Sequence, residues 1–193
     1  MEAVVIAAGE GRRLRPLTKR WPKPILPIDG KPVIATLMHE LEQAELGPVT
    51  VVVGHLGDQI RRLLDGLDVR FAEQPEPLGS ADAVLRAVEA GARAPFVVSV
   101  ADTVYSPGDV GRFTREWEES GADSAMAPPL WGVGPGLLPQ LEELSGPPFE
   151  LLETFERAGS AVKPLDLGPF RQLTEPADVV IHNFVYLESE TDE

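Results

Sequence analysis

Hydrophobic positions along the chain follow two patterns, and each pattern predicts one kind of element. In several short segments nearly every residue is apolar, which is typical of strands buried on both faces of a parallel sheet. The longer segments between them carry apolar residues at the three- and four-residue spacing of an amphipathic helix. The expected strands are residues 3–8, 49–53, 69–72, 95–101 and 123–127.

Residues with known end preferences mark where the predicted helices begin and end. Pro32 suits the first position of a helix, because its missing N–H would have no partner there. Asp58 and Ser80 are expected N-caps, since their side chains can accept hydrogen bonds from the first free N–H groups. The expected helices are residues 32–46, 58–67, 80–90, 109–120 and 149–158.

Strands and helices alternate along the chain, and this order predicts the fold class. A βαβα order favours an α/β protein with a mostly parallel sheet that is covered by helices on both faces. We therefore expect a Rossmann-like three-layer α/β/α sandwich, formed by a single domain over residues 1–193.

The pattern degrades after the fifth expected strand. Prolines and glycines in residues 128–148 leave room only for a short helix around 137–144, so we expect an excursion over the mouth of the functional site. Residues 161–167 can return to the sheet. Residues 174–178 are expected to start a capped helix.

Composition and charge exclude several classes of protein. The chain has no cysteine, so disulfides, thiolate metal sites and a cysteine nucleophile are excluded. Its formal net charge of −14 argues against nonspecific nucleic-acid binding, which needs a basic surface. No apolar run approaches the ~20 residues of a membrane span, and the amino terminus begins directly with a strand. The sequence therefore favours a cytoplasmic protein without nucleic-acid or membrane partners, and it leaves a homo-oligomer open.

A basic loop follows the first strand. Gly9-Glu10-Gly11 ends the apolar run, and the two glycines allow the backbone to turn tightly and approach a ligand closely. Such basicity in an acidic chain indicates an anion site, with phosphate as the expected anion. The spacing fits neither a Walker loop nor a dinucleotide fingerprint, and a purely structural turn is the alternative. The cationic side chains of the loop are Arg12, Arg13, Arg15, Lys19, Arg20 and Lys23.

Asp102 directly follows the apolar strand at 95–101, at the sheet edge where open α/β folds bind ligands. The basic loop and the loop at 74–81 are expected at the same edge. A triphosphate carries about four negative charges, so cations and a divalent metal are needed to hold it and to neutralise the leaving pyrophosphate. A strand-end carboxylate suits Mg²⁺, which prefers hard oxygen ligands, although such aspartates also serve as N-caps or in turns.

A longer pattern extends the basic loop to residue 27. Its residues are Gly9-x-Gly11-x-Arg13-Leu14-x-Pro16-Leu17-Thr18, followed by Pro22-Lys23-Pro24-x-Leu26-Pro27. This pattern resembles the nucleotidyltransferase family that makes nucleoside-diphosphate sugars, the sugar-1-phosphate nucleotidylyltransferases. The resemblance implies a nucleotide-diphospho-sugar transferase fold in which the loop wraps a nucleoside triphosphate. It implies phosphate contacts from Arg13 and Lys23, and further nucleotide contacts from Ala7, Ala8, Gly9 and Gly11.

A second motif lies in the loop after the third expected strand. Its residues are Gln74-x-x-Pro77-x-Gly79-Ser80-Ala81. By itself this segment predicts a proline-stiffened turn that leads into a helix. The segment is also similar to the second motif of the same family, and this implies that Gln74, Gly79 and Ser80 contact the base and the ribose. A glutamine amide offers both a donor and an acceptor, which suits a base edge.

The resemblance also implies a metal-binding role for Asp102 and a second acidic ligand beside it. One alignment matches the family's Thr-Pro-Glu-Asp-like helix start to residues 174–178, which puts 171–173 at the second ligand, where no carboxylate occurs. The other matches residues 166–169 to an Asp-x-Gly-Thr-Pro step and makes Asp166 the ligand, and we favour it. Lys163 resembles a lysine that some members use near the sugar phosphate.

These features imply a magnesium-dependent nucleotidyltransferase of the EC 2.7.7 type. It would transfer a nucleoside monophosphate from a nucleoside triphosphate to a phosphorylated acceptor, expected to be a sugar 1-phosphate, and release pyrophosphate. Arg13, Lys23 and Asp102 are the expected catalytic residues, with Asp102 and Asp166 holding Mg²⁺. The chain length is nearer to the molybdenum-cofactor nucleotidyltransferases, so that acceptor class stays open. A nucleotide-binding pseudoenzyme without the second metal ligand is the other alternative.

Overall fold

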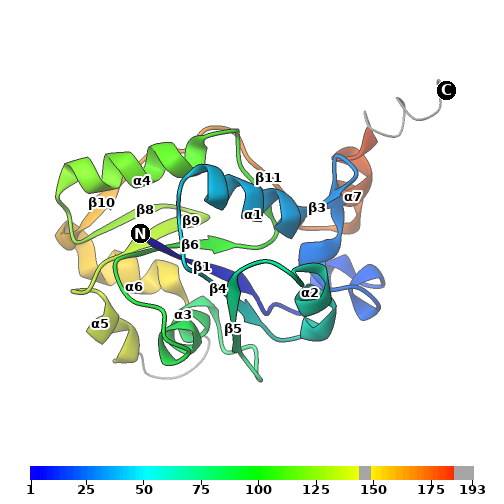
Figure 1. The fold of residues 1–193 in the computed structure, drawn as a ribbon, viewed down its shortest axis with the longest axis horizontal. Coiled ribbons are helices and arrows are strands. Elements are labelled where there is room, and N and C mark those ends of the chain that lie inside the picture. Colours follow the sequence, from blue (N-terminus) through cyan, green and yellow to red (C-terminus); the bar gives the residue numbers. More distant parts are fainter. Residues whose placement is uncertain (144–148, 185–193) are drawn as a thin grey trace.

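The computed structural model of the protein describes residues 1–143 and 149–184 and is built on a seven-stranded sheet (Figure 1). The strands pair in parallel except for β9, which is antiparallel to both of its neighbours. In order across the sheet they are β10 (Val162–Pro164), β8 (Ser124–Ala127), β9 (Leu130–Val133), β6 (Phe96–Val100), β1 (Glu2–Ala7), β4 (Val49–Val53) and β5 (Val69–Glu73).

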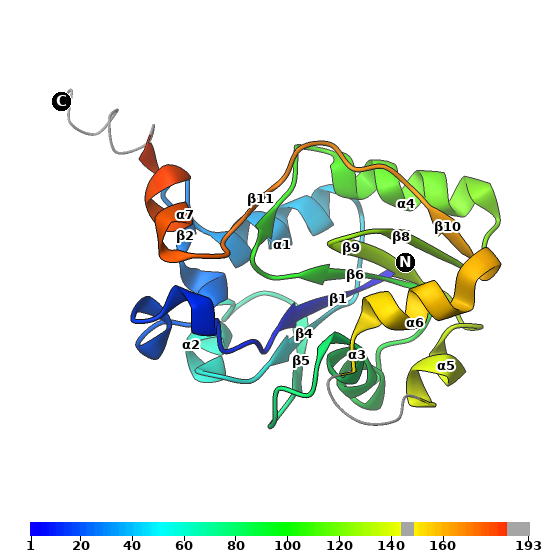
Figure 2. The same cartoon turned by 180° about the vertical axis from the view of Figure 1, so that it is seen from behind.

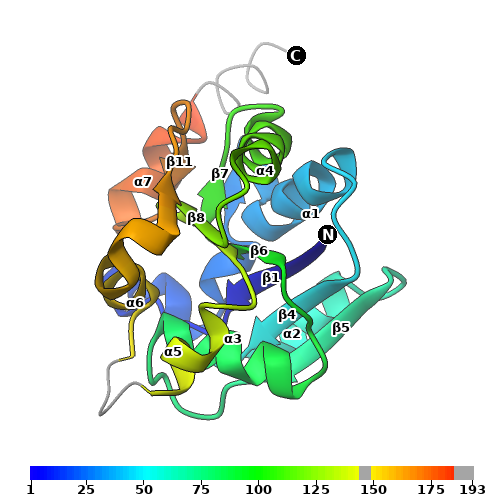
Figure 3. The same ribbon diagram turned by 90° about the vertical axis from the view of Figure 1, so that its left-hand side faces the viewer.

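Helices cover both faces of this sheet, so the predicted three-layer α/β/α sandwich with a mostly parallel sheet is confirmed (Figure 3). One face packs against α1 (Val33–Gln43), α2 (Gly57–Leu63) and α4 (Asp109–Ser120). The other face packs against α3 (Ser80–Glu89), α5 (Leu138–Glu142) and α6 (Leu151–Ala158). No helix in the described part of the chain is long and apolar enough to cross a membrane.

Strand β1 explains why the first apolar run has no polar face. Successive side chains of a strand point to opposite faces of the sheet. Val5 therefore packs into the core under α1 and α4, whereas Val4 packs into the core under α3 and α6, and both are fully buried. Since β1 pairs in parallel with β4 on one side and β6 on the other, it lies where the polar ends of three strands come together.

A smaller lobe joins the beginning and the end of the chain. Its core contains Leu14 and Leu26 from the basic loop and Leu173 from the carboxy-terminal segment, all buried. Figure 2 shows the carboxy-terminal helix beside the amino-terminal loop. The elements of the lobe are β2 (Pro27–Ile28), β3 (Lys31–Pro32), β7 (Thr103–Val104), β11 (Arg171–Gln172), α7 (Pro176–Ile181) and the 3-10 turns Arg12–Leu14, Leu17–Lys19 and Lys23–Ile25.

The excursion expected for residues 128–148 was wrong where the structure describes them, but the short helix expected around 137–144 is confirmed as α5. Instead of an excursion over the functional site, β9 fills the sheet between β8 and β6, and α5 packs beside α3 and α6. Gly132 lies inside β9 because the indole of Trp117 packs over it: a Cβ there would lie 2.5 Å from the ring. The glycine that suggested a loop is thus a packing requirement of a buried strand. The rest of the expectation, residues 144–148, lies outside the described part.

Two expected N-caps were also wrong. Helix α2 begins at Gly57 after Leu56, whose φ is +55°, and Asp58 lies within the first turn. Helix α3 follows Gly79, and Ser80 is its first residue. The Ser80 hydroxyl donates a hydrogen bond to Glu150 Oε2 at 2.5 Å, and its oxygen accepts one from the N–H of Leu151 at 2.9 Å. Ser80 therefore joins the starts of α3 and α6 instead of capping α3.

The return of the chain to the sheet is confirmed, since β10 pairs in parallel with β8. The capped start of α7 is confirmed as well. The carboxylate of Asp178 accepts hydrogen bonds from the N–H groups of Thr174 and Glu175, at 2.6 and 2.8 Å. These bonds hold the pKa of Asp178 below its usual value.

Candidate active site

A cavity of about 300 Å³ opens at the carboxyl ends of β1 and β6. This is the edge at which open α/β sheets bind ligands, because strand ends leave polar loops around a shared crevice. The basic loop forms one wall, the end of β6 forms the floor, and Thr174 contributes from the carboxy-terminal segment. The lining residues are Ile6, Ala7, Gly9, Gly11, Arg12, Arg13, Leu14, Lys23, Pro24, Val100, Ala101, Asp102 and Thr174.

The basic loop is folded back on itself around Gly11. This glycine has φ +60°, and a Cβ there would lie 2.8 Å from the Thr18 methyl group. Thr18 is buried, and its hydroxyl donates a hydrogen bond to the Gly11 carbonyl at 2.8 Å. His55, at the end of β4, lies 2.8 Å through Nε2 from the Thr18 carbonyl. The sequence alone assigned no role to His55, which braces the loop from behind.

The cations of the loop are not equivalent. Glu10 pairs with Arg12 at 2.7 Å and with Arg15 at 3.4 Å, and the hydrogen bond from Arg12 lowers the pKa of Glu10. Arg13 lines the cavity, is exposed, and forms no ion pair with any residue in the described part of the chain. The single carboxylate of the loop, Glu10, is thus shared by Arg12 and Arg15, and the Arg13 guanidinium remains available to bind an anion.

Lys23 and Asp102 meet at the floor of the cavity. They are 79 positions apart, and the Lys23 ammonium is in direct ion-pair contact with Asp102 Oδ2. Both side chains are largely buried, with 16% and 15% of their surface exposed. The predicted catalytic residues Arg13, Lys23 and Asp102 therefore lie around one cavity. Of the expected nucleotide contacts, Ala7, Gly9 and Gly11 line it too, whereas Ala8 is buried and does not.

Gln172 is the residue that sequence analysis missed. Strand β11 pairs antiparallel with β7, which puts Gln172 opposite Thr103 and beside Asp102. Its Nε2 donates a hydrogen bond to Asp102 Oδ1 at 3.0 Å, and the next N–H, from Leu173, donates to the Asp102 carbonyl at 3.2 Å. The signal was present in the alignment on residues 174–178, but that alignment was not favoured because Gln172 is not a carboxylate.

Asp166 and Lys163 do not line this cavity. Asp166 is exposed, and its carbonyl accepts a hydrogen bond at 3.0 Å from Arg112 on α4. Lys163 is exposed on β10, the strand at the far edge of the sheet from β5. The structure therefore brings Gln172, and not Asp166, to Asp102.

The loop after β5 lies along the same edge, two strands away from β1. Gln74 is buried, and its Nε2 donates to the Gly79 carbonyl at 3.0 Å and to Asp82 Oδ2 at 2.8 Å. Gly79 has φ +109°, and a Cβ there would collide with the backbone of Phe149. Gly54, which follows β4, packs closely against both this loop and the end of β1. A Cβ at Gly54 would lie within 2.9 Å of the carbonyl oxygens of Ala8 and Gln74.

The carboxy-terminal segment is anchored to the β2–β3 hairpin. Asn183 is buried; its Oδ1 accepts a hydrogen bond from the Gly30 N–H and its Nδ2 donates to the Pro27 carbonyl, both at 2.8 Å. Arg171 forms a bidentate pair with Asp29, and this guanidinium holds the pKa of the Asp29 carboxyl below its usual range. These bonds fix both ends of the segment that carries Gln172 and Thr174.

Oxygen donors at the cavity floor fit a magnesium ion that is held mainly by substrate and water. No group of three or more His, Asp or Glu side chains suited to a metal occurs within residues 1–143 and 149–184. Mg²⁺ is usually held by one or two protein oxygens together with substrate phosphates and several waters. Asp102 supplies a carboxylate at the cavity floor, and the carboxamide of Gln172 lies beside it. The donor set therefore fits a metal brought with a triphosphate.

An α/β sandwich whose glycine-rich basic loop faces a strand-end aspartate defines the class of nucleoside triphosphate transferases. The comparison with protein families gives the same class: residues 3–155 match the MobA-like NTP transferase domain. The chain belongs to this family, and the nucleotidyltransferase relationship expected from the sequence is confirmed.

Individual relatives share this relationship over part of their length. The UTP–glucose-1-phosphate uridylyltransferase AglF of Haloferax volcanii is 34% identical over 130 residues, which cover 65% of this chain and 53% of the relative. The N-acetylmuramate alpha-1-phosphate uridylyltransferase of Neisseria meningitidis is 39% identical over 112 residues, 54% of this chain and 48% of the relative. The chain spans about half the length of these curated relatives.

A solved structure shares the fold across nearly the whole chain. It is a Bacillus anthracis protein provisionally assigned as a glucose-1-phosphate thymidylyltransferase, in complex with sucrose. It superposes with a TM-score of 0.82 at 16% identity, covering 96% of this chain and 95% of that one. At this identity the likeness establishes the fold alone.

Proposed function

We propose that the protein is a magnesium-dependent nucleotidyltransferase that transfers a nucleoside monophosphate from a nucleoside triphosphate to a sugar 1-phosphate and releases pyrophosphate. The juxtaposition of Lys23 and Asp102 carries the proposal. Their ion pair stands at the floor of a cavity whose rim holds Arg13, so one cavity combines a carboxylate for a metal with two cations for phosphates.

The reaction needs no covalent intermediate on the protein. A phosphate oxygen of the sugar 1-phosphate attacks the α-phosphorus, a new P–O bond forms, and the bond to the β-phosphate oxygen breaks in line with it. The leaving pyrophosphate takes the bonding electrons. The protein therefore has to hold two anions close together and screen their repulsion. Arg13 and Lys23 supply the positive charge for this.

Lys23 has two partners in this scheme. With no phosphate bound, its ammonium neutralises Asp102 at the cavity floor. A bound α-phosphate would draw the ammonium away from Asp102, and the carboxylate would then be free to hold a divalent cation. Asp102 and Gln172 would hold the Mg²⁺, and the ion would supply positive charge to the phosphates.

The experiment is a matrix of nucleoside triphosphates against phosphorylated acceptors, with pyrophosphate release measured in the presence of Mg²⁺. The acceptors are a panel of sugar 1-phosphates. Release from one pairing is expected, with a loss of about 10²- to 10³-fold in Asp102→Asn. Asp109→Asn, which changes a buried aspartate on α4 outside the cavity, is the matched control. No release from any pairing would contradict the proposal.

One observation favours a second candidate, a nucleotide-binding protein without turnover. The place beside Asp102 that an acidic second ligand would take is occupied by the neutral side chain of Gln172. A single carboxylate holds a metal more weakly than two, because each anionic ligand adds attraction for the cation. Triphosphate binding without pyrophosphate release, for every acceptor in the matrix, would establish this alternative.

A further inference from the structure

Two hydrogen bonds connect the residue after the end of β4 to the glycine turn of the basic loop. His55 Nε2 lies 2.8 Å from the Thr18 carbonyl oxygen, and the Thr18 hydroxyl donates to the Gly11 carbonyl at 2.8 Å. A carbonyl can only accept a hydrogen bond, so His55 carries a hydrogen on Nε2. Thr18 is 1% exposed, so the middle of this connection is buried. His55 and Thr18 together form what we call the loop brace.

The loop brace ends at Gly11, between the two parts of the loop that carry Arg13 and Lys23. A Cβ at Gly11 would lie 2.8 Å from the Thr18 methyl group and 3.3 Å from the Lys23 Cβ, so these residues are packed without spare room. Arg13 lies in the 3-10 turn Arg12–Leu14, which follows Gly11 directly. A shift of Gly11 would therefore change the distance between the cations of Arg13 and Lys23.

The backbone on both sides of His55 is closely constrained. Gly54, directly before it, packs against the end of β1, because a Cβ at Gly54 would lie 2.8 Å from the Ala8 carbonyl oxygen. Leu56, directly after it, has φ +55°, a conformation that a bulky residue keeps only where its surroundings enforce it. The loop brace is therefore anchored to the central strands of the sheet, and not to another mobile part of the loop itself.

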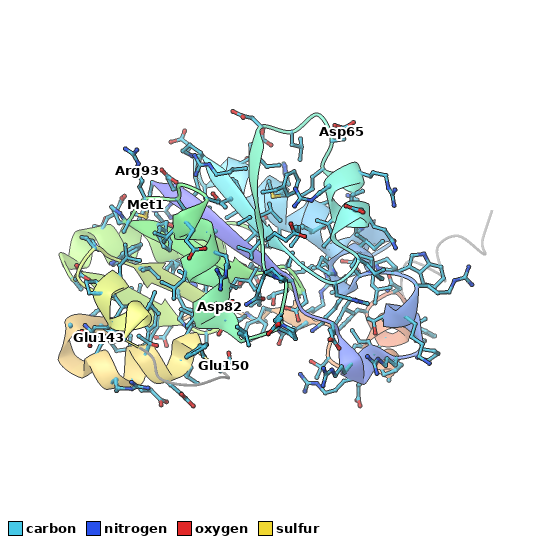
Figure 4. The ribbon with its side chains drawn as sticks, turned by 90° about the horizontal axis from the view of Figure 1, so that it is seen from below. Met1, Asp65, Asp82, Arg93, Glu143 and Glu150 are labelled. Carbon is cyan, nitrogen blue, oxygen red and sulfur yellow. The ribbon has the colours of Figure 1, made fainter. Side chains whose placement is uncertain are left out.

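Helix α2 adds a second contact to the same stretch of the loop. Gln59 Nε2 donates to the Arg20 carbonyl at 2.9 Å. Helix α2, which precedes Asp65, lies at the same end of the molecule as the basic loop (Figure 4). Neither His55 nor Gln59 is among the residues that line the cavity. Both act on the loop from outside the site, through its backbone carbonyls.

We propose that His55 and Thr18 are positioning residues, which hold Arg13 and Lys23 at the spacing at which both cations bind one polyphosphate. Two cations bind one phosphate chain together only when the distance between them matches the spacing of its oxygens. Cations that are already in place also lose less freedom on binding than cations that must first be ordered. The inference rests on the proposed phosphate site and adds the residues outside the cavity that set its geometry.

The test measures equilibrium binding of inorganic triphosphate with Mg²⁺ to the full chain by titration calorimetry. This probe has no base and no sugar, so its affinity depends on phosphate contacts alone. Arg13→Ala should weaken binding by about tenfold or more in the otherwise unmodified protein. His55→Ala should weaken binding by a similar factor. In the His55→Ala background, Arg13→Ala should weaken it by less than about a further twofold, because Arg13 has already left its place.

Two further substitutions of His55 differ in where they put a donor. The side-chain nitrogen of glutamine can take the place of Nε2, whereas that of asparagine corresponds to Nδ1 and stops short of the Thr18 carbonyl. His55→Gln should therefore bind inorganic triphosphate within about threefold of the unmodified protein, and His55→Asn should lose as much as His55→Ala. His39→Ala, which removes an exposed histidine of α1 outside the cavity, is the matched control and should leave binding unchanged.

A second variant keeps the test independent of how well His55→Ala folds. Thr18→Val retains the shape of the buried side chain and removes the hydroxyl that bonds to Gly11. In this background too, Arg13→Ala should have little further effect. The double variant of His55→Ala and Thr18→Val should lose no more than about the larger single loss, since both bonds act on Gly11. If Arg13→Ala costs its full factor in both backgrounds, the inference is overturned.

A purely structural role for the loop brace has a different signature. It would lower the unfolding temperature of His55→Ala while Arg13→Ala keeps its full effect, and that result also overturns the inference. Binding does not require turnover. If His55→Ala abolishes the effect of Arg13→Ala while no pairing releases pyrophosphate, the inference stands and the proposed transferase activity fails. If one pairing releases pyrophosphate but the unmodified protein does not bind inorganic triphosphate, the activity stands and the inference fails.

Discussion

Two walls of the cavity differ in how the chain holds them. The loop wall, residues 9–24, is tied largely to itself: the Arg12–Glu10 and Thr18–Gly11 hydrogen bonds join residues two and seven positions apart. The C-terminal wall, residues 171–183, is held by bonds across the chain. Gln172 meets Asp102 over 70 positions, and Asn183 meets Gly30 over 153.

The two walls therefore have different roles: the loop wall provides positive charge, and the C-terminal wall positions Asp102. The loop wall supplies cations, and neighbours in the same loop determine which of them are free to bind an anion. Glu10, for example, pairs with Arg12 and Arg15. The C-terminal wall contributes the neutral side chain of Thr174 to the cavity lining, and its Gln172 donates a hydrogen bond to Asp102. Changes in the loop wall should therefore act on catalysis, and changes in the C-terminal wall on metal affinity and stability.

The largest expected effect is on the loop wall. Arg13→Ala should lower pyrophosphate release by about 10²-fold, because a guanidinium that forms no ion pair among residues 1–143 and 149–184 is removed from the phosphates. Arg12→Ala is the matched control, since Arg12 is the adjacent arginine and its charge is already paired with Glu10. Steady-state kinetics of both variants test this. Equal losses in the two would contradict the distinction between paired and unpaired cations.

Asn183→Ala should give the second largest effect, on stability. The side chain is 6% exposed and bonds to Gly30, Pro27 and Val179, so its loss leaves buried groups unpaired. We expect the free energy of unfolding to fall by about 2 kcal/mol, measured by urea denaturation. Asp29→Asn breaks an exposed ion pair in the same contact and should cost less than about 1 kcal/mol. A larger loss in Asp29→Asn would refute this ranking.

Gln172→Asp should sharpen the comparison by adding charge to the C-terminal wall. A second carboxylate beside Asp102 strengthens the attraction for a divalent cation, so the Mg²⁺ concentration for half-maximal activity should fall by about fivefold. A magnesium titration of pyrophosphate release measures it. Gln140→Asp, on the exposed surface of α5, is the matched control and should leave the titration unchanged. An unchanged titration in Gln172→Asp would remove this residue from the metal site.

The smallest effect concerns the start of α7 and depends on pH. The N–H groups of Glu175 and Thr174 hold the pKa of Asp178 below its ordinary 3.8. A lowered pKa in the folded state contributes stability that is fully present above the unfolded pKa and disappears as the pH falls through the folded one. The stability lost in Asp178→Asn should therefore be greater at pH 7 than at pH 3. Urea midpoints at both values test this, and a pH-independent difference would contradict it.

Sequence patterns were most reliable where one segment decides its own structure. Buried strands, amphipathic helices and the basic loop were predicted because each leaves a periodic or compositional signal. The fold class followed from their order. Strand β9 was missed because its proline and glycine neighbours indicate a loop, while Gly132 is present to admit the Trp117 ring. That requirement belongs to a residue fifteen positions away in helix α4, and no local pattern reports it.

The residues of the candidate site also differ in whether a local sequence signal predicts them. The sequence alone predicted the basic loop, its cations Arg13 and Lys23, and a strand-end aspartate at residue 102, because these residues lie in or next to segments with strong local signals. Only the tertiary structure decided that Glu10 pairs with Arg12 and Arg15, that Gln172 and not Asp166 stands beside Asp102, and that Gln74 donates a hydrogen bond to Asp82. Each of these depends on which side chains meet in space, and strand pairing and helix packing make those meetings across distances along the chain that residue patterns do not encode.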